Sequence, residues 1–563
     1  MKTVFLAVIS VALVLGGCGG ETKSADTRSL RPTLSPSGLT GDDLAFSKFT
    51  EPVTVRVGMG LNPLSTSLPP GDTYADNELT RYLLDTFNIK IVVDWTAASG
   101  NDFTQRVSLA MASNALPDGL STGLATIKKA AKSEMLYDLT DIFDMYASSQ
   151  VKQIMATTQG RAIDAVTVDG KMVAIPGVTV DTDSVAVMNV LKSWLDMYGL
   201  PVPRTVDDIE NVARVFKERQ PAGADTIPIV GPGKDGPLYS TFNSALAGEN
   251  TFDPVFAAYD LYPGFFLDNG DGTVSYGSLD PRMKQALEKL ALWYHDGLID
   301  PQLGVRDSPT ESILSNTAGI RFGAWWGLGY GNLDSFKNDP TANWQSYPLY
   351  TDDGKWNSKI GTPTYLGGIV SANASPDTAA AIVILSNIMV RDVPKFDLAL
   401  FDNYFPILFN IAPADETEYS YRALLKILSG EAEPEDYNDP MSVYKHLYRD
   451  TGIIRDVIPN FDPGRELSIQ DFNTDIEGWN RAYAMLVGNR PFATVPIDKK
   501  VFSVTYTMTD LLERRWSNLE TMEKEVMMGI VTGRSDISAF DKFTEDWLRQ
   551  GGQEILDDLA AMN

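Results

Sequence analysis

The sequence predicts an α/β protein, and three neighbouring segments carry that prediction. Valines alternate with polar residues over Val53–Val57, which is typical of a half-buried strand that ends at Gly58. Asp76-Asn77 then begins a helix that runs to Phe87, and Ile89–Val93 forms a second apolar strand. A strand, a helix and a strand at this spacing form a βαβ unit, which implies a parallel sheet.

The chain continues with the same alternation of helices and short strands. We expect a helix over Asp102–Ser113, a break at Leu116-Pro117-Asp118 and a short third strand after it. Val166–Ile175 predicts a hairpin, because Asp169-Gly170 at its centre is a strong type I′ turn signal.

Helices dominate the second half, and local signals mark where several of them begin. Thr205 to Asp208 fits a capping box, Asp280-Pro281 places a proline at a first helical position, and Ser375-Pro376 starts another helix. Apolar residues recur at helical spacing from Leu512 to Val526, and two shorter helices flank Gly551-Gly552.

Composition excludes several classes of function. The chain has 563 residues and a formal net charge of −27. Nucleic acid is therefore disfavoured as a partner, because an acidic protein surface repels the phosphate backbone. A single Cys rules out an intrachain disulfide framework. Only two His, His295 and His446, leave little room for histidine-based catalysis or metal sites, and we expect no catalytic residues, no metal and no cofactor.

The first residues form a targeting segment. Lys2 precedes the apolar run Val4–Leu15, which is too short for a membrane span of about 20 residues and typical of a signal peptide. Leu15-Gly16-Gly17-Cys18 resembles the bacterial lipobox, so we expect a signal peptide over 1–17 and lipidation of Cys18. The alternative is a plain signal peptide with an incidental Cys. Residues 18–52 are rich in Gly, Ser, Thr, Pro and Asp, which indicates a flexible tether.

Several segments, in order along the chain, resemble the extracellular solute-binding proteins of bacterial ATP-driven importers, in the large subfamily that serves complex sugars. They are Leu116-Pro117-Asp118, Asp169-Gly170-Lys171 with Ile175-Pro176, Lys192-Ser193-Trp194-Leu195 with Gly199-Leu200, Pro203 and Thr205, Tyr294 with Gly297–Pro301, and the C-terminal Glu523–Gly533 with Phe540–Gly552.

The resemblance implies a two-lobed fold of the type II periplasmic-binding-protein kind, with a ligand cleft between lobes that a multi-strand hinge joins. We expect lobe 1 to comprise residues 53–180 and about 366–410, and lobe 2 about 185–362 and about 411–563. The implied function is capture of an oligosaccharide and its delivery to the membrane permease. We expect a monomer anchored by lipid on the extracellular face of the cell membrane, or on the periplasmic side where an outer membrane exists.

Aromatic side chains are the main candidates for ligand contacts, because Trp and Tyr faces complement the flat C–H faces of sugar rings. Trp325-Trp326 stands out between Phe322-Gly323 and a glycine-rich loop, and the resemblance places this segment at the mouth of the second lobe. Polar residues at the carboxyl ends of parallel strands are a second group, because ligands of open α/β sheets bind there. The full candidate set is Trp325, Trp326, Tyr330, Trp344, Tyr404, Phe405, Asn62, Ser65, Asp118 and Ser121. By contrast, we expect four tryptophans on helical faces in the core: Trp194, Trp293, Trp516 and Trp547.

Three questions stay open at this point. A structural calcium ion is not excluded, although Asn269 and Asp271 match only two positions of a calcium loop and Asp268–Thr273 fits a hairpin turn better. A neutral sugar is favoured, because the only bases near the aromatic segment in sequence are Arg321 and Lys337. The alternatives are a lipoprotein that binds a peptide or a sensor partner and, less favoured, a surface glycoside hydrolase or lyase with a pair of carboxylates.

Overall fold

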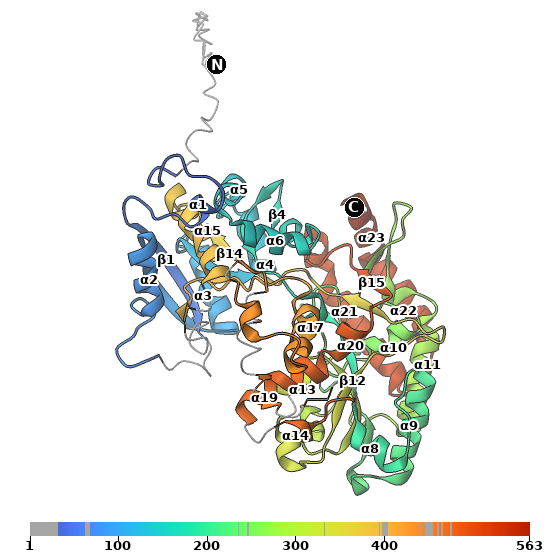
Figure 1. Cartoon of the computed structure of the whole chain (residues 1–563). Helices are drawn as coiled ribbons and strands as arrows, with labels where there is room; N and C mark the ends of the chain where they lie inside the picture. The colour runs from blue at the N-terminus through green and yellow to red at the C-terminus, as the bar shows by residue number, and fades with distance from the viewer. Residues whose placement is uncertain are drawn as a thin grey trace, which may run out of the picture.

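The computed structural model divides into two lobes that lie side by side (Figure 1). It describes residues 32–562 apart from 62–67, 235, 245–246, 331–332, 393–394, 397–403, 440, 445–446, 448–453, 456, 459–460, 463–464 and 473–475. The signal segment, Cys18, residues 19–31 of the tether and His446 therefore lie outside the described residues.

Lobe 1 is built on a five-stranded sheet in the order β2-β1-β3-β14-β6. The strands are β1 (Val53–Leu61), β2 (Ile89–Ala98), β3 (Gly119–Gly123), β14 (Leu366–Val370) and β6 (Ala174–Pro176). β1 pairs in parallel with β2 and β3, while β14 pairs antiparallel with β3 and β6. The helix α2 (Glu78–Phe87) connects β1 to β2, with Asn77 and Thr80 forming a capping box at its start, so the predicted βαβ unit is confirmed.

Helices from two separate parts of the chain cover this sheet. They are α1 (Gly41–Ala45), α3 (Asn101–Ala112), α4 (Leu124–Lys132), α5 (Thr140–Tyr146), α6 (Ser149–Thr157), α7 (Arg161–Ala165) and α15 (Pro376–Arg391). α15 begins at the predicted cap, Ser375, and is buried along almost its whole length. The predicted hairpin is present as β4 (Thr167–Val168) and β5 (Lys171–Met172), and Asp169 and Gly170 have the positive φ angles, 51° and 75°, of a type I′ turn.

Lobe 2 contains a four-stranded sheet in the order β12-β7-β11-β8. The strands are β12 (Trp344–Tyr347), β7 (Val187–Leu191), β11 (Ala318–Gly323) and β8 (Ile227–Ile229). β11 runs antiparallel to β7 and parallel to β8. Two further ladders belong to this half of the molecule: the antiparallel β9 (Phe266–Asp268) with β10 (Val274–Tyr276), whose turn was predicted, and the parallel β13 (Asn357–Ile360) with β15 (Lys499–Phe502).

The helices of lobe 2 pack around one large apolar core. They include α8 (Lys192–Tyr198), α9 (Val206–Arg219), α10 (Asp253–Ala258), α11 (Met283–His295), α12 (Thr310–Leu314), α13 (Gly327–Tyr330), α14 (Leu333–Asn338), α17 (Glu416–Leu428), α19 (Ile476–Tyr483), α20 (Arg490–Thr494), α21 (Asp510–Val531), α22 (Ala539–Trp547) and α23 (Gln553–Met562). The four tryptophans expected in the core are buried: Trp194, Trp293, Trp516 and Trp547.

The start of α11 differs from the prediction. The helix begins at Met283, whereas Asp280-Pro281 was expected to be its cap and first helical residue. The carboxylate of Asp280 accepts a hydrogen bond from the amide of Arg282, two residues on, at 2.9 Å. Because Pro281 and Arg282 form this turn, the first helical residue is Met283.

Three segments cross between the lobes and hydrogen-bond to one another as a hinge. The amides of Gly177 and Thr179 donate to the carbonyls of Leu366 and Pro363, both at 2.9 Å. In the third segment, the carbonyl of Asn410 accepts from Val178 at 2.8 Å. The apolar core of lobe 1 draws on residues 44–178 and 369–411, and that of lobe 2 on residues 185–360 and 421–559. We propose that the lobe boundaries lie within these crossing segments.

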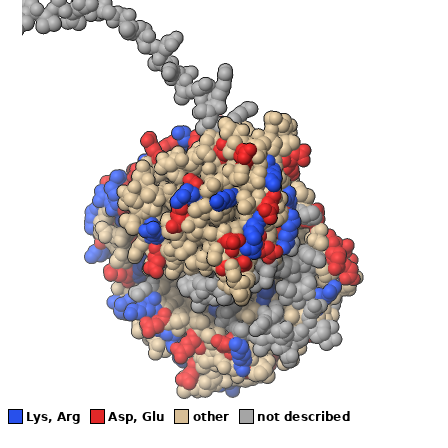
Figure 2. Space-filling view, turned by 90° about the vertical axis from the view of Figure 1, so that its left-hand side faces the viewer, with Lys and Arg blue, Asp and Glu red and all other residues tan. Residues whose placement is uncertain are grey.

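The surface of the described residues mixes both signs of charge. On the face shown in Figure 2, acidic and basic side chains are interspersed and form no large patch of one sign. None of the helices in the described part of the chain combines the length and the apolar character that a membrane span needs.

Candidate ligand-binding site

The aromatic segment of lobe 2 lies directly beside the hinge. β11 ends at Gly323, and the chain passes through Trp325 and Trp326 into α13. The indole Nε1 of Trp325 donates to Oδ1 of Asp183 at 2.8 Å. Asp183 belongs to the 3-10 turn η2 (Asp181–Ser184), which follows the first hinge crossing. The segment is therefore fixed to the point where the chain enters lobe 2.

A loop over residues 247–250 closes the other side of this segment. The amide of Ala247 donates to the carbonyl of Asp183 at 2.9 Å, and the amide of Asn250 donates to the carbonyl of Phe322 at 2.7 Å. The loop thereby brings the side chain of Glu249 next to the end of β11. We call Asp183, Glu249, Arg321, Trp325 and Trp326 the hinge-side site.

The two tryptophans of this site have different environments. Trp325 is 6% exposed and belongs to the core of lobe 2. Trp326 is only partly buried and packs against Ala186, Ala247 and Ala324. Trp326 also packs against the core of lobe 2, and part of its surface remains exposed. Trp326 is therefore the tryptophan of the pair with a free surface for a ligand.

Glu249 and Arg321 form an ion pair in which Arg321 is buried and Glu249 is partly exposed. The Nη1 atom of Arg321 lies 3.4 Å from Oε2 of Glu249, and the side chains are 4% and 38% exposed. The amide of Ala324 donates to Oε1 of Glu249 at 3.3 Å. A Cβ atom at Gly323 would lie 2.7 Å from the Glu249 carboxylate, and one at Gly327 would lie 2.8 Å from Arg321 Nη2. Glycine at both positions makes room for this pair.

Burial shifts the pKa of two groups in the hinge-side site, Asp183 and Arg321. Loss of hydration raises the pKa of Asp183 to about 6, and the hydrogen bond from Trp325 and the charge of Arg481 offset only part of this effect. Burial also lowers the pKa of Arg321, against the smaller opposing effect of Glu249. The charged side chain of the hinge-side site that is substantially exposed is that of Glu249.

Several predicted site residues cannot be placed, or lie elsewhere than expected. Asn62 and Ser65 are outside the described residues, as is the side chain of Tyr330. Ser121 lies within β3, but Asp118 precedes the strand. The prediction that Asp118 follows the third strand is therefore wrong, because the Leu-Pro-Asp break ends the preceding loop and the strand begins only after it. The Asp118 carboxylate accepts from the amide of Arg56 at 2.9 Å, and burial raises its pKa.

The remaining aromatic candidates are enclosed in the two cores. Trp344 is 0% exposed, and its Nε1 donates to the hydroxyl of Ser335 at 3.2 Å. Tyr404 donates to the carboxylate of Asp72 at 3.0 Å, and Phe405 lies in the core of lobe 1. In this arrangement of the lobes these three side chains offer a ligand no free face, so we leave them out of the site proposed below.

Sequence reasoning missed Asp183 and Glu249. Asp183 could have been noticed, because Asp181-Thr182-Asp183-Ser184 is a polar turn soon after the strand that ends at Pro176. Glu249 carries no comparable signal. Its role depends on contacts with residues more than seventy positions later in the chain, which no local pattern encodes.

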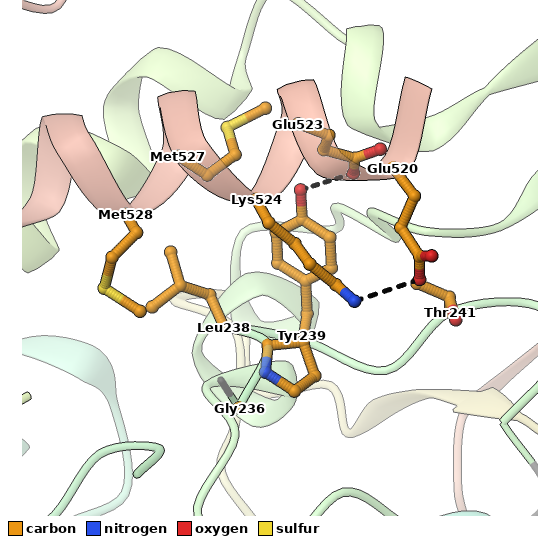
Figure 3. Close-up of a pocket in the computed structure, with 10 residues that line it drawn as sticks. Gly236, Leu238, Tyr239, Thr241, Glu520, Glu523, Lys524, Met527 and Met528 are labelled. Carbon is orange, nitrogen blue, oxygen red and sulfur yellow. Dashed lines mark hydrogen bonds and ion pairs between the residues drawn. The ribbon is translucent and has the colours of Figure 1, made fainter. Parts of the chain in front are cut away.

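Cavities in the described residues lie outside the five residues of the hinge-side site, and two of them bear on the search for a ligand site. A cavity of about 510 Å³ lies between the lobes, where Lys128 and Lys132 of α4 face Thr507, Asp510 and Arg514. The pocket in Figure 3 lies within lobe 2, and its volume of about 30 Å³ has room for a water molecule but not for a sugar. There the buried carboxylate of Glu523 accepts from Tyr239 at 2.6 Å and Tyr276 at 2.9 Å.

No group of three or more His, Cys, Asp or Glu side chains that could hold a metal ion occurs in the part of the chain that the structure describes. His295 is exposed at the end of α11, and its Nδ1 lies 3.1 Å from Oδ1 of Asp296.

Comparison with known proteins finds similarity to one family. Residues 72–301 match the family described as bacterial extracellular solute-binding protein. The fructooligosaccharide ABC transporter substrate-binding protein FusA of Streptococcus pneumoniae is 24% identical over 363 residues, which is 62% of this chain and 60% of the relative. The chain is thus similar to bacterial extracellular solute-binding proteins over this part of its length. The aligned part spans less than two thirds of that curated relative.

Solved structures of solute-binding proteins share the fold of this chain. An HMO-binding, ABC-transporter-associated protein from Bifidobacterium longum infantis has a TM-score of 0.56 at 17% identity and covers 91% of this chain and 98% of its own. The alginate-binding protein AlgQ2 has a TM-score of 0.54 at 16% identity, with 92% and 99% covered. FusA of S. pneumoniae in complex with kestose has a TM-score of 0.53 at 16% identity, with 91% and 98% covered. The type II two-lobed fold predicted from the sequence is confirmed.

Proposed function

We propose that this solute-binding protein captures a neutral oligosaccharide between its lobes and delivers it to the permease of an ABC importer. The observation that carries the proposal is the hinge-side site, where the partly exposed Trp326 packs against Ala247 of the loop that carries Glu249, whose side chain is 38% exposed. An aromatic face beside hydrogen-bond acceptors suits a sugar ring, which presents flat C–H faces and hydroxyl donors at its rim. The name of FusA, a fructooligosaccharide-binding protein, supports an oligosaccharide as the ligand.

Two lobes joined by a three-segment hinge suit a binding protein whose shape differs between the free and the ligand-bound state. A ligand that contacts both lobes favours the closed arrangement by its extra affinity for that arrangement, and the permease then recognises the closed form. The importer's transmembrane subunits are thus the proposed partner, and the protein acts as a monomer.

We further propose that Cys18 carries a lipid that anchors the protein at the outer face of the cell membrane, or on the periplasmic side where an outer membrane exists. The sole Cys of the chain occupies the position that a lipobox requires. Replacing Cys18 with Ala should move the protein from the membrane fraction to the soluble or secreted fraction, as measured by fractionation with an alkaline wash. Retention of the variant in washed membranes would contradict the anchor.

The two bases that lie near the aromatic segment in the sequence favour an uncharged ligand, because neither is free. Arg321 is buried, and Lys337 pairs with Asp334 at 3.1 Å. A uronate or a sulfated sugar needs accessible bases to replace its hydration. We therefore expect the affinity for the best ligand to change little between 0.01 and 0.15 M salt, over which the Debye length falls from about 30 to about 8 Å.

The decisive experiment is a thermal-shift screen with neutral oligosaccharides (kestose, nystose, maltotetraose, lacto-N-tetraose) and acidic ones (trisaccharides of alginate and of polygalacturonate). A true ligand present at about 100 times its Kd adds about 2.7 kcal/mol to the free energy of unfolding. Calorimetry at the two salt concentrations follows for each hit, and mass spectrometry checks that the sugar stays intact. Hits confined to the acidic sugars would contradict the neutral-sugar proposal, and hydrolysis of the sugar would contradict a pure binding role.

A further inference from the structure

Arg321 is an unusual residue to find beneath a binding surface. It lies within β11, opposite Asn189 of β7, and is 3% exposed. Its Nε and Nη2 atoms have no hydrogen-bond partner in the described protein. Its one charged contact is the 3.4 Å approach of Nη1 to Glu249. A buried guanidinium so poorly satisfied is costly, and such groups are often kept for a function other than stability.

Glu249 is placed to make use of that buried charge. One carboxylate oxygen faces the guanidinium, and the other accepts from the amide of Ala324. Each contact uses one acceptor position of its oxygen, and a carboxylate oxygen has two. The outer positions remain open on a side chain that is 38% exposed. Arg321 and the amide of Ala324 thus orient the carboxylate, and its exposed part remains available to a ligand.

Three features make the position of Glu249 fixed. Gly323 and Gly327 leave space for its carboxylate and for the Arg321 guanidinium, since a side chain at either position would meet these atoms within 3 Å. The loop that carries Glu249 is held to β11 by the bond from Asn250 to Phe322. Trp326, on the same short segment as Ala324, packs against Ala247 of the loop.

We infer that Glu249 is a specificity-determining residue, which accepts hydrogen bonds from the hydroxyls of a neutral sugar that lies on Trp326, and that Arg321 is the positioning residue that orients it. The inference rests on the proposed function. A charged acceptor makes stronger hydrogen bonds to hydroxyls than a neutral amide does, and it repels the carboxylate of a uronate. Glu249 thus both strengthens the binding of neutral sugars and excludes acidic ones.

The test compares wild type, Glu249→Gln, Arg321→Lys and a control, Glu218→Gln, which alters an exposed carboxylate of α9 whose side chain is 74% exposed. Calorimetry measures the Kd of the tightest neutral sugar of the panel above and of the alginate trisaccharide. Glu249→Gln keeps the shape of the side chain but removes its charge. We expect it to weaken neutral-sugar binding at least tenfold and to reduce the preference for neutral over acidic sugar at least tenfold.

Arg321→Lys retains the positive charge but not the planar fork of donors. We expect it to reduce the same preference several-fold while the protein remains folded by circular dichroism, and Glu218→Gln to match wild type. The preference is the informative readout, because a merely structural defect weakens both sugars together.

An unchanged Kd and an unchanged preference in Glu249→Gln would overturn this inference and leave the proposed function standing. Equal weakening of both sugars in Glu249→Gln would also overturn it, since the residue would then set only the structure of the site. If wild type bound none of the neutral sugars, the proposed function would fail and this inference with it.

Discussion

Asp183 joins the hinge to the aromatic segment through a single hydrogen bond from Trp325. Burial raises its pKa to about 6 from the ordinary 3.8. A carboxylate with a raised folded-state pKa favours folding while it is protonated, and this contribution is lost as the pH rises from about 4 through about 6. Asp183→Asn keeps the acceptor for the indole and removes the charge. We expect its melting temperature to exceed that of wild type above pH 7 and to approach it at pH 4. Equal melting temperatures across this range would show that Asp183 is well hydrated.

The two adjacent tryptophans should respond differently to truncation. Trp325 is enclosed and hydrogen-bonded, so Trp325→Ala should cost about 3–5 kcal/mol of unfolding free energy. Trp326 is partly exposed, so Trp326→Ala should change stability less but weaken sugar binding at least tenfold, about 1.4 kcal/mol. Chemical denaturation and calorimetry of both variants separate the two effects. Normal sugar binding by Trp326→Ala would place the aromatic contact elsewhere.

At the scale of single elements, α9 begins with the capping box that its sequence predicts. The hydroxyl of Thr205 accepts from the amide of Asp208 at 3.2 Å, and the Asp208 carboxylate accepts from the amide of Thr205 at 3.0 Å. Desolvation raises the pKa of Asp208, but the hydrogen bonds that its carboxylate accepts from the amides of Thr205 and Arg204, with the Thr205 hydroxyl, outweigh it and lower that pKa. The capping box predicted from the sequence is therefore confirmed.

Thr205→Ala removes one half of this capping box. We expect a loss of about 1 kcal/mol of unfolding free energy, since the first turn of α9 would lose a partner for its amide. Thr205→Ser, which keeps the hydroxyl, is the matched control and should stay close to wild type. Denaturant unfolding measures both variants, and equal stability of Thr205→Ala and wild type would show that water replaces the cap without cost.

At the scale of the whole molecule, polar contacts bridge the lobes around the 510 Å³ cavity. Lys132 of α4 pairs with Asp510 at the start of α21, and Lys128 donates to the hydroxyl of Thr507. Burial and the nearby charge of Lys132 lower the pKa of Lys128. These contacts join lobe 1 to lobe 2 outside the hinge, so they hold the lobes in the arrangement seen here.

Lys132→Ala should therefore reduce the population of this arrangement. The exposed pair contributes at most about 1 kcal/mol, so we expect a modest shift in the distance between fluorescent labels on the two lobes, measured without sugar. Wild type should shift in the same direction between 0.01 and 1 M salt, where the Debye length falls from about 30 to about 3 Å. Exchanging the two charges, with Lys132→Asp and Asp510→Lys together, should restore the distance. A label distance that neither salt nor Lys132→Ala alters would show that the hinge alone fixes the lobes.

The sequence by itself determined the features that depend on neighbours in the chain. The alternating valines of β1, the caps of α2, α9 and α15, and the Asp169-Gly170 turn all appear where local patterns placed them. Such elements are specified by side chains that contact the backbone a few residues away, so a linear pattern contains the whole cause. The family resemblance supplied the two-lobed fold in the same way, through short segments that recur in order.

Only the tertiary structure decided which of these residues could meet a ligand. Trp325 and Trp326 are identical in type and adjacent, yet one is buried against Asp183 and the other lies partly open beside the loop of Glu249. Trp344, Tyr404 and Phe405 looked like cleft aromatics and lie in the cores. Exposure depends on which distant segments cover a side chain, and the ion pair of Arg321 with Glu249 joins residues 72 positions apart. Long-range packing of this kind has no local sequence pattern, so the site could be identified only from the tertiary structure.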